Sequence, residues 1–195
     1  MVSFKRKHSG VSLTLDPIEV AVLAQVIGEV VDVIGPSPAH TEGVQWAREL
    51  GLAGLGELGE AGGAGGAAED APAPIDPVTA RLFPDAYRDD DEAALDFRRF
   101  TGEELRAEKS ANAQLLLGSL PEGGGSITLD DDATSAWLGA LNDARLALGT
   151  ALDVNENTHE ELSTLEAGEP RAQRLLVYLW LGELLESLLF AIGSE

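Results

Sequence analysis

Residues 11–34 read VSLTLDPIEVAVLAQVIGEVVDVI, and this stretch decides the fold that we expect. Its first five residues alternate apolar and polar side chains, which is the pattern of a strand with one buried face. Asp16 then supplies a helix N-cap, Pro17 suits the first helical position, and Glu19 completes a capping box. Apolar side chains surround most of the following turns. The stretch therefore predicts a strand followed by a largely buried helix that ends near Ile34.

Two further segments predict a small antiparallel sheet around this strand. Residues 2–8 are a second strand candidate, and the pair Ser9-Gly10 supplies the turn between it and residues 11–15. Residues 126–129 are a third short strand candidate, and they follow a glycine-rich turn. We expect this third strand to join the N-terminal hairpin.

The rest of the chain is mainly helical in pattern. Further helix starts are expected at Asp76, in the acidic run 89–92, at Thr101, at Asp130 and at Pro170. Residues 51–73 are rich in Gly, Ala and Pro and predict a flexible insertion, with a short helix at 41–50 before it. Residues 155–169 are acidic and predict a solvated loop. The expected architecture is one mainly α domain over residues 1–195, with five to six helices and a small antiparallel sheet.

The chain is strongly acidic and contains no cysteine. It has 13 Lys and Arg against 34 Asp and Glu, which gives a formal net charge of −21. Binding to nucleic acid or to an anionic membrane needs a cationic surface that displaces counterions, so this charge disfavours direct DNA binding and membrane association. The lack of cysteine excludes disulfides, thiolate metal sites and a cysteine nucleophile within these residues.

No sequence pattern of an enzyme or a cofactor site is found. The histidines, His8, His40 and His159, have no neighbouring ligands at metal-binding spacing, and the glycine-rich stretch lacks the lysine of a phosphate-binding loop. The acidic runs 89–92 and 130–132 coincide with helix starts, where carboxylates cap the backbone, and we favour this role over cation binding. We therefore expect no enzymatic activity, no metal and no cofactor.

The most apolar segment, Leu175–Ile192, is expected to be a buried core helix rather than a membrane span. It contains Glu183 and Glu186, and each carboxylate near the centre of a bilayer costs roughly 2.5–3.5 kcal/mol. The first residues lack the uninterrupted apolar block and the cleavage pattern of a secretory signal. These features favour a cytoplasmic protein.

Two polar rows on predicted helices are candidates for a buried network. Lys109 and Asn112 lie along the apolar stripe of one helix, and Tyr178 and Glu186 belong to a row on the last helix. A buried lysine needs a counter-charge. We therefore hypothesise that Lys109 pairs with Glu186 across two packed helices and that Asn112 satisfies the remaining polar groups. A structural network and a pocket for a partner or ligand both fit this pattern.

Three of the basic residues gather in one helical segment. Arg98, Arg99 and Arg106 lie close together in a chain that is otherwise acidic. A solvated helix face with ion pairs such as Arg99–Glu103 explains them, and a docking patch for an acidic partner or for nucleic acid is an alternative.

Several segments, taken in order, resemble an actinobacterial family. These segments are 76–78, 81–87 (RLFPDAY), 96–101 (DFRRFT), 105–106, 137–149 (WLGALNDARLALG), 178–181 (YLWL) and 186–188. Their order resembles the AosR-like family, which was formerly filed as a domain of unknown function. The resemblance extends over the N-terminal hairpin and helix and over everything from residue 76 onward.

The resemblance implies a non-enzymatic regulator of transcription under oxidative stress. Such a protein would contact an extracytoplasmic-function sigma factor and promote sulfur-assimilation and cysteine-synthesis genes. Redox sensing in the family is attributed to a cysteine pair that forms an intrachain disulfide. This chain has no cysteine, so thiol sensing does not transfer to it.

We expect a regulator that acts through protein–protein contact with a sigma factor or a polymerase-associated protein. An acidic chain suits electrostatic steering to the basic surface of such a partner. The alternative is an adaptor or structural homodimer without a direct transcriptional role, with the exposed part of the last helix as its interface. A ligand-binding module built on Lys109 and Asn112 is a third possibility.

Overall fold

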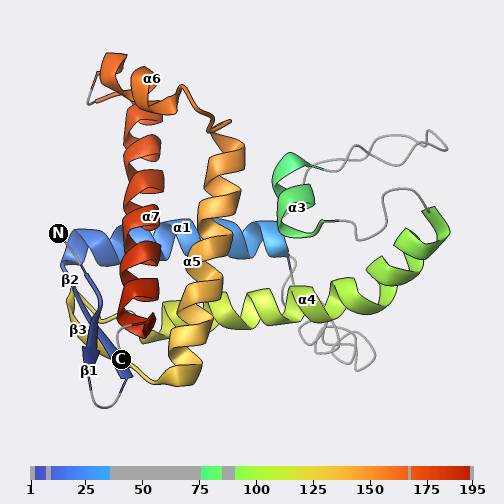
Figure 1. Ribbon diagram of the computed structural model, residues 1–195, viewed down its shortest axis with the longest axis horizontal. Coiled ribbons are helices and arrows are strands. Elements are labelled where there is room, and N and C mark those ends of the chain that lie inside the picture. Colours follow the sequence, from blue (N-terminus) through green and yellow to red (C-terminus); the bar gives the residue numbers. More distant parts are fainter. Residues whose placement is uncertain (1–2, 8–9, 36–75, 85–90, 167, 194–195) are drawn as a thin grey trace, which may run out of the picture.

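The computed structural model describes residues 3–7, 10–35, 76–84, 91–166 and 168–193, without the side chains of residues 91–101. The strands are β1 (Lys5–Lys7), β2 (Gly10–Leu15) and β3 (Gly125–Leu129). The helices are α1 (Pro17–Ile34), α3 (Pro77–Leu82), α4 (Asp91–Ser119), α5 (Asp131–Ala151), α6 (Thr158–Thr164) and α7 (Pro170–Gly193). The expected mainly α architecture with a small antiparallel sheet is confirmed (Figure 1). The expected helix at 41–50, the insertion at 51–73 and Ser9 of the predicted turn lie outside the described residues.

The three strands form one antiparallel sheet in the order β1-β2-β3, as expected. Arg6 pairs with Val11, and Val11 pairs in turn with Leu129. The central strand β2 buries Val11, Leu13 and Leu15 on the core side, and the exposed Thr14 hydroxyl lies 2.7 Å from that of Ser126. The alternation seen in the sequence therefore gives the strand its buried face.

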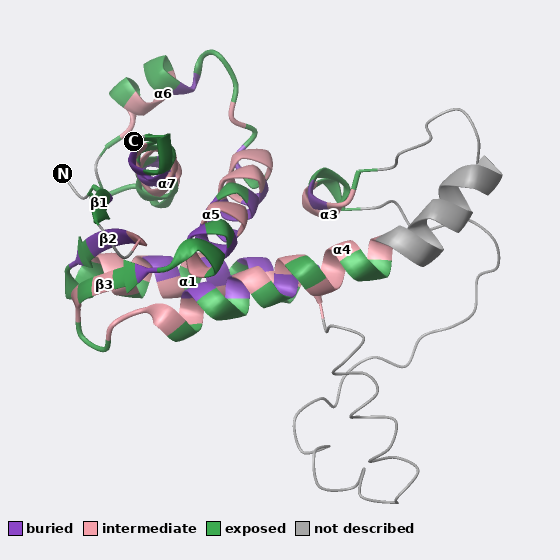
Figure 2. Cartoon of the chain, turned by 60° about the horizontal axis from the view of Figure 1, so that its bottom comes forward, coloured by how far each residue is buried: buried purple, intermediate pink, exposed green. Residues whose placement is uncertain are grey.

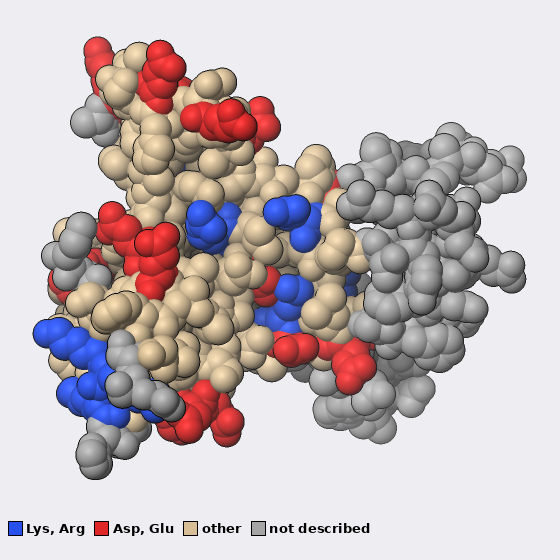
Figure 3. Space-filling model, viewed as in Figure 1, with Lys and Arg blue, Asp and Glu red and all other residues tan. Residues whose placement is uncertain are grey.

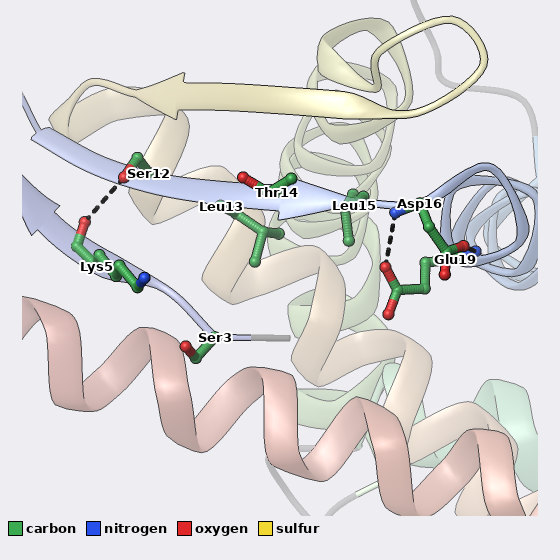
Figure 4. A pocket seen from close by; sticks show the side chains of 8 residues that line it. All are labelled: Ser3, Lys5, Ser12, Leu13, Thr14, Leu15, Asp16 and Glu19. Carbon is green, nitrogen blue, oxygen red and sulfur yellow. Dashed lines mark hydrogen bonds between the residues drawn. The ribbon is translucent and has the colours of Figure 1, made fainter. Parts of the chain in front are cut away.

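Helix α1 begins with the predicted capping box. The Asp16 carboxylate accepts from the backbone N–H groups of Ile18 and Glu19 at 2.7 and 2.9 Å. The Glu19 carboxylate accepts from the Asp16 N–H at 2.7 Å (Figure 4). Both ends of the box satisfy N–H groups that would otherwise lack partners at a helix start.

The prediction that most of the surface of α1 is buried was wrong. Only Leu23, Ile27, Val30 and Ile34 are fully buried, and Ile18 is 73% exposed. The helix packs on α3, α4 and α5, and these neighbours cover one stripe of its surface.

Helix α5 is the centre of the core. It contacts α1, α3, α4, α7 and the sheet, and buried residues concentrate where α1, α4 and α5 face one another (Figure 2). Trp137 is fully buried, its indole N–H donates to the Ser119 hydroxyl at 2.8 Å, and the Phe4 ring meets it edge-on at a centroid distance of 5.9 Å. This tryptophan therefore joins α4, α5 and the segment before β1.

Two predictions about helix boundaries were wrong. Residues 155–169 were expected to be a loop, but they contain α6, in which Thr158 is buried. The Arg171 guanidinium fixes this helix through the Glu161 carboxylate and donates to the Leu152 carbonyl at 3.1 Å. Thr101 was expected to be a point where the preceding helix bends or restarts, and the restart was wrong because Thr101 lies inside the continuous α4.

Helix α7 is long and apolar enough to cross a membrane by length and composition. Core helices of soluble proteins share these properties, so this is weak evidence for a span. The expected burial is confirmed for one face, which carries Leu181, Leu184 and Leu188. Outside this face Leu176 is 50% exposed and Leu189 is 49% exposed.

The start of β2 gives a test of the sheet. Gly10 has φ 127°, and a Cβ atom there would overlap the carbonyl oxygen of Leu129 on the paired strand. We expect Gly10→Ala to lower the free energy of unfolding by at least roughly 1–3 kcal/mol, the cost of holding a side chain in this backbone region. Urea unfolding followed by circular dichroism measures the change.

The matched control is Gly28→Ala in the middle of α1, where an added Cβ meets nothing within 4 Å. It should stabilise the protein by roughly 0.5–1 kcal/mol, because alanine loses less backbone entropy in a helix than glycine does. Equal stability of the two variants would contradict the strand geometry at Gly10.

Candidate functional site

The described charged residues include one nearly buried ion pair, at the contact between α4 and α5. The Lys109 ammonium lies 2.6 Å from the Asp143 carboxylate, and the two side chains are 16% and 5% exposed. Burial raises the pKa of the Asp143 carboxyl, and the ammonium of Lys109 acts in the opposite direction. The pair gives each buried charge its partner.

The hypothesis that Lys109 pairs with Glu186 was wrong. Helix α5 contacts both α4 and α7, it supplies the carboxylate that reaches Lys109, and Glu186 on α7 is exposed. A signal for the true partner was present in the sequence. Asp143 lies four residues before the buried Ala147 and three after the buried Ala140, so it occupies the apolar stripe of α5.

Asn112 and Tyr178 pack against glycines of α5, but in different contacts. Asn112 of α4 lies beside Gly139, where an added Cβ would be 2.8 Å from its side-chain nitrogen. The Tyr178 ring of α7 lies beside Gly149, where a Cβ would be 2.9 Å from the ring. Asn112 therefore lies in the same contact between α4 and α5 as Lys109, and Tyr178 lies in the separate contact between α5 and α7.

Arg106 has a role within the fold. Its guanidinium donates to the Ile34 carbonyl at the end of α1, and it lies over the Phe83 ring at 4.3 Å from the centroid. These contacts connect α1, the end of α3 and α4. The side chains of Arg98 and Arg99 lie outside the described residues, so the docking patch remains a prediction.

Acidic and basic side chains are both spread over the described surface. On the face in Figure 3, Asp and Glu groups lie over α6 and beside the basic groups, and Lys and Arg groups form a patch over β1 and separate spots near α3, α4 and α5. Within the ranges that the structure describes, no group of three His, Asp or Glu side chains could hold a metal ion.

Three open cavities in the described part of the chain are candidate binding surfaces. The first, of about 420 Å³, lies beside β2 and the start of α1 (Figure 4). Polar groups there form hydrogen bonds with each other, and the Ser12 hydroxyl donates to the Lys5 carbonyl at 3.4 Å. The second, of about 300 Å³, is an apolar groove between α1 and α7. The third, of about 440 Å³, is lined by Arg81, Arg145 and Tyr178, none of which had been connected with one another from the sequence.

Comparison with known families identifies the chain. The model of a family described as a domain of unknown function, DUF2017, matches residues 1–192. The chain belongs to this family. Its similarity to curated AosR proteins confirms the expected AosR-like resemblance.

Two mycobacterial relatives carry informative names. The putative oxidative stress regulator AosR of Mycobacterium leprae is 37% identical over 138 residues, which are 64% of this chain and 62% of the relative. The oxidative stress regulator AosR of Mycobacterium tuberculosis is 36% identical over 139 residues, again 64% of this chain and 62% of the relative. The alignment thus spans about three fifths of each relative's length. No solved structure matches this member of the DUF2017 family.

The Lys109–Asp143 pair gives a test of the network. Lys109→Met leaves the Asp143 carboxylate buried without its cation, so the free energy of unfolding should fall by roughly 3–5 kcal/mol at neutral pH. The double variant Lys109→Met/Asp143→Leu should recover most of this loss, because no unpaired charge remains. Urea unfolding of the single and double variants measures the coupling.

The loss in Lys109→Met should also depend on pH. Without Lys109 the folded-state pKa of Asp143 rises further, so the folded state binds a proton more tightly than the unfolded state. The resulting stability is present below the ordinary pKa of about 4 and is lost as pH rises through the raised value. The deficit should therefore be smaller at low pH than at neutral pH.

Independent, additive effects of Lys109→Met and Asp143→Leu would contradict the pairing, and the exposed Glu186→Gln serves as the uncoupled control.

Proposed function

We propose that this protein is a non-enzymatic regulator in the oxidative-stress response that acts by binding a sigma factor. The names of its relatives supply the physiological context. The observation that carries the mode of action is the exposed apolar groove between α1 and α7, because a surface of this kind suits protein–protein contact.

The groove has the form of a seat for an amphipathic helix. Ile18 and Val22 are one turn apart on α1, and Leu176 and Trp180 are one turn apart on α7. Ile18 is 73% exposed and Leu176 is 50% exposed, so apolar surface is available to a partner. Partner helices insert apolar side chains at the same one-turn spacing into such grooves.

The charges around the groove favour a basic partner. Glu19 lines the groove, Glu183 is exposed one turn beyond Trp180 on α7, and the chain carries a net charge of −21. Sigma factors present basic surfaces because they contact promoter DNA, so the two proteins attract each other at long range. A second copy of this chain would bring the same carboxylates to the groove, which disfavours the homodimer alternative.

The proposed contact does not depend on thiol chemistry. The chain contains no cysteine, so an intrachain disulfide cannot control the groove. We propose binding that is independent of the thiol redox state, in the cytoplasm, where sigma factors act.

The proposal predicts the effect of a charge in the groove. Leu176→Asp should weaken binding to an extracytoplasmic-function sigma factor of the same organism by tenfold or more, since it places a carboxylate in an apolar contact. Binding of the full chain is measured by calorimetry, with and without reducing agent, and the affinity should be the same in both. Raised salt should slow association.

The matched control is Leu115→Asp, because Leu115 is 40% exposed on α4 and does not line the groove. This variant should bind as the unchanged protein does. Lack of binding to any sigma factor, together with a self-associated species that Leu176→Asp dissociates, would instead support the adaptor or homodimer alternative.

A further inference from the structure

The cavity between α3, α5 and α7 concentrates positive charge in an acidic chain. Arg81 from the last turn of α3 and Arg145 from α5 both line it, beside Tyr178 from α7. Within the described residues neither arginine forms an ion pair. The chain has 34 acidic residues against 13 basic ones, so two unpaired arginines on one cavity are not explained by a lack of carboxylates.

Arg145 is incompletely satisfied by the protein. Its Nε atom is the one buried side-chain nitrogen or oxygen without a hydrogen-bond partner in the part of the chain that the structure describes. Its guanidinium lies 5.2 Å from the centroid of the Tyr178 ring, which supports the cation but provides no counter-charge. Buried donors without partners are rare in folded proteins. This Nε is buried beside Gly182, which does not line the cavity, so an anion in the cavity would meet the terminal nitrogens of the guanidinium.

Two glycines give these side chains their room. A Cβ atom at Gly149 would lie 2.9 Å from the Tyr178 ring, and one at Gly182 would lie 3.4 Å from the Arg145 Nε. The α5–α7 contact therefore accommodates the ring and the guanidinium side by side. A guanidinium held in this way keeps a planar row of donors that suits two oxygens of a carboxylate or a phosphate.

Asp153 limits the kind of anion that fits. It lines the same cavity. The hydrogen bond with Glu161 is the main reason that the pKa of Arg171 is raised, and the charge of Asp153 adds to this shift. A carboxylate at the wall repels a polyanion such as nucleic acid but accepts a hydrogen bond from a hydroxyl or amino group. The volume of about 440 Å³ is in the range of small-molecule sites.

We propose that this cavity binds a small organic anion, with its carboxylate or phosphate group on Arg145 and Arg81 and a hydroxyl or amino group toward Asp153. The anion supplies the counter-charge that the two arginines lack in the described protein. This site is separate from the α1–α7 groove, and it does not depend on the proposed sigma-factor contact.

Thermal unfolding of the full chain tests the proposal. The probes are inorganic phosphate, glycerol 3-phosphate and lactate, each titrated at constant ionic strength against sodium chloride. We expect at least one probe to raise the melting temperature in a saturable way, because a ligand that binds only the folded state stabilises it. The comparison of phosphate-bearing probes with lactate identifies the preferred anionic group.

Two variants and one control assign the effect to the cavity. Arg145→Met and the exposed Arg81→Gln should each weaken binding of the effective probe by roughly tenfold or more, as expected for loss of a charge-assisted hydrogen bond. Arg174→Met removes an exposed arginine of α7 that does not line this cavity, and it should bind the probe unchanged. Without any probe, Arg145→Met should melt no lower than the unchanged protein, because it removes an unpaired buried donor.

Three results would overturn the proposal. The first is that no probe gives a saturable rise in melting temperature. The second is that the probe raises the melting temperature of Arg81→Gln as much as that of the unchanged protein. The third is that Arg174→Met weakens binding of the probe as much as the cavity variants do, which would indicate general screening of charge. If Arg145→Met does not fold, Arg81→Gln alone decides the outcome, because its side chain is exposed.

Discussion

Helix α5 packs against α1, α3, α4, α7 and the sheet, and small side chains make these contacts possible. Alanines at 136, 140, 144 and 147 are buried along it, and glycines at 139 and 149 accept Asn112 and Tyr178. Larger side chains at these positions would push the neighbouring helices outward. Trp137 is the exception, and it fills the space where α4 and the sheet meet α5. The positions of the other elements depend on this close approach.

The same close approach brings polar side chains to α5 in two contrasting ways. At the α4 contact, Lys109 and Asp143 form a closed pair in which each charge has its partner. At the α7 contact, Arg145 has an aromatic ring beside it and forms no ion pair with a described carboxylate, and it opens onto a cavity that Asp153 also lines. A closed pair suits a structural role, since a new partner would have to displace a buried ion. A cation without such a partner receives an anion without displacing a buried ion, although both groups lose water when they pair.

What the sequence predicts well is local. The caps at Asp16 and Asp130 and the proline that starts α7 act within one helical turn, so the residues beside them suffice. The partner of Lys109 depends on which helix lies next to α4, and a single sequence does not contain that order. Helix α6 depends on an arginine from another element, so its composition alone indicated a loop. The unpaired state of Arg145 appears only when three elements are placed together.

Helix α7 connects the groove and the cavity. Leu176 and Trp180 line the groove, and Tyr178, midway between them in sequence, lines the cavity, which places it on the other side of the helix. A ligand that binds one position of α7 more tightly than another would change both surfaces together. The size of this shift is limited by the difference between its affinities for the two positions. This arrangement needs no cysteine. It would allow a chemical signal to reach a protein contact in a chain that has no thiol with which to sense one.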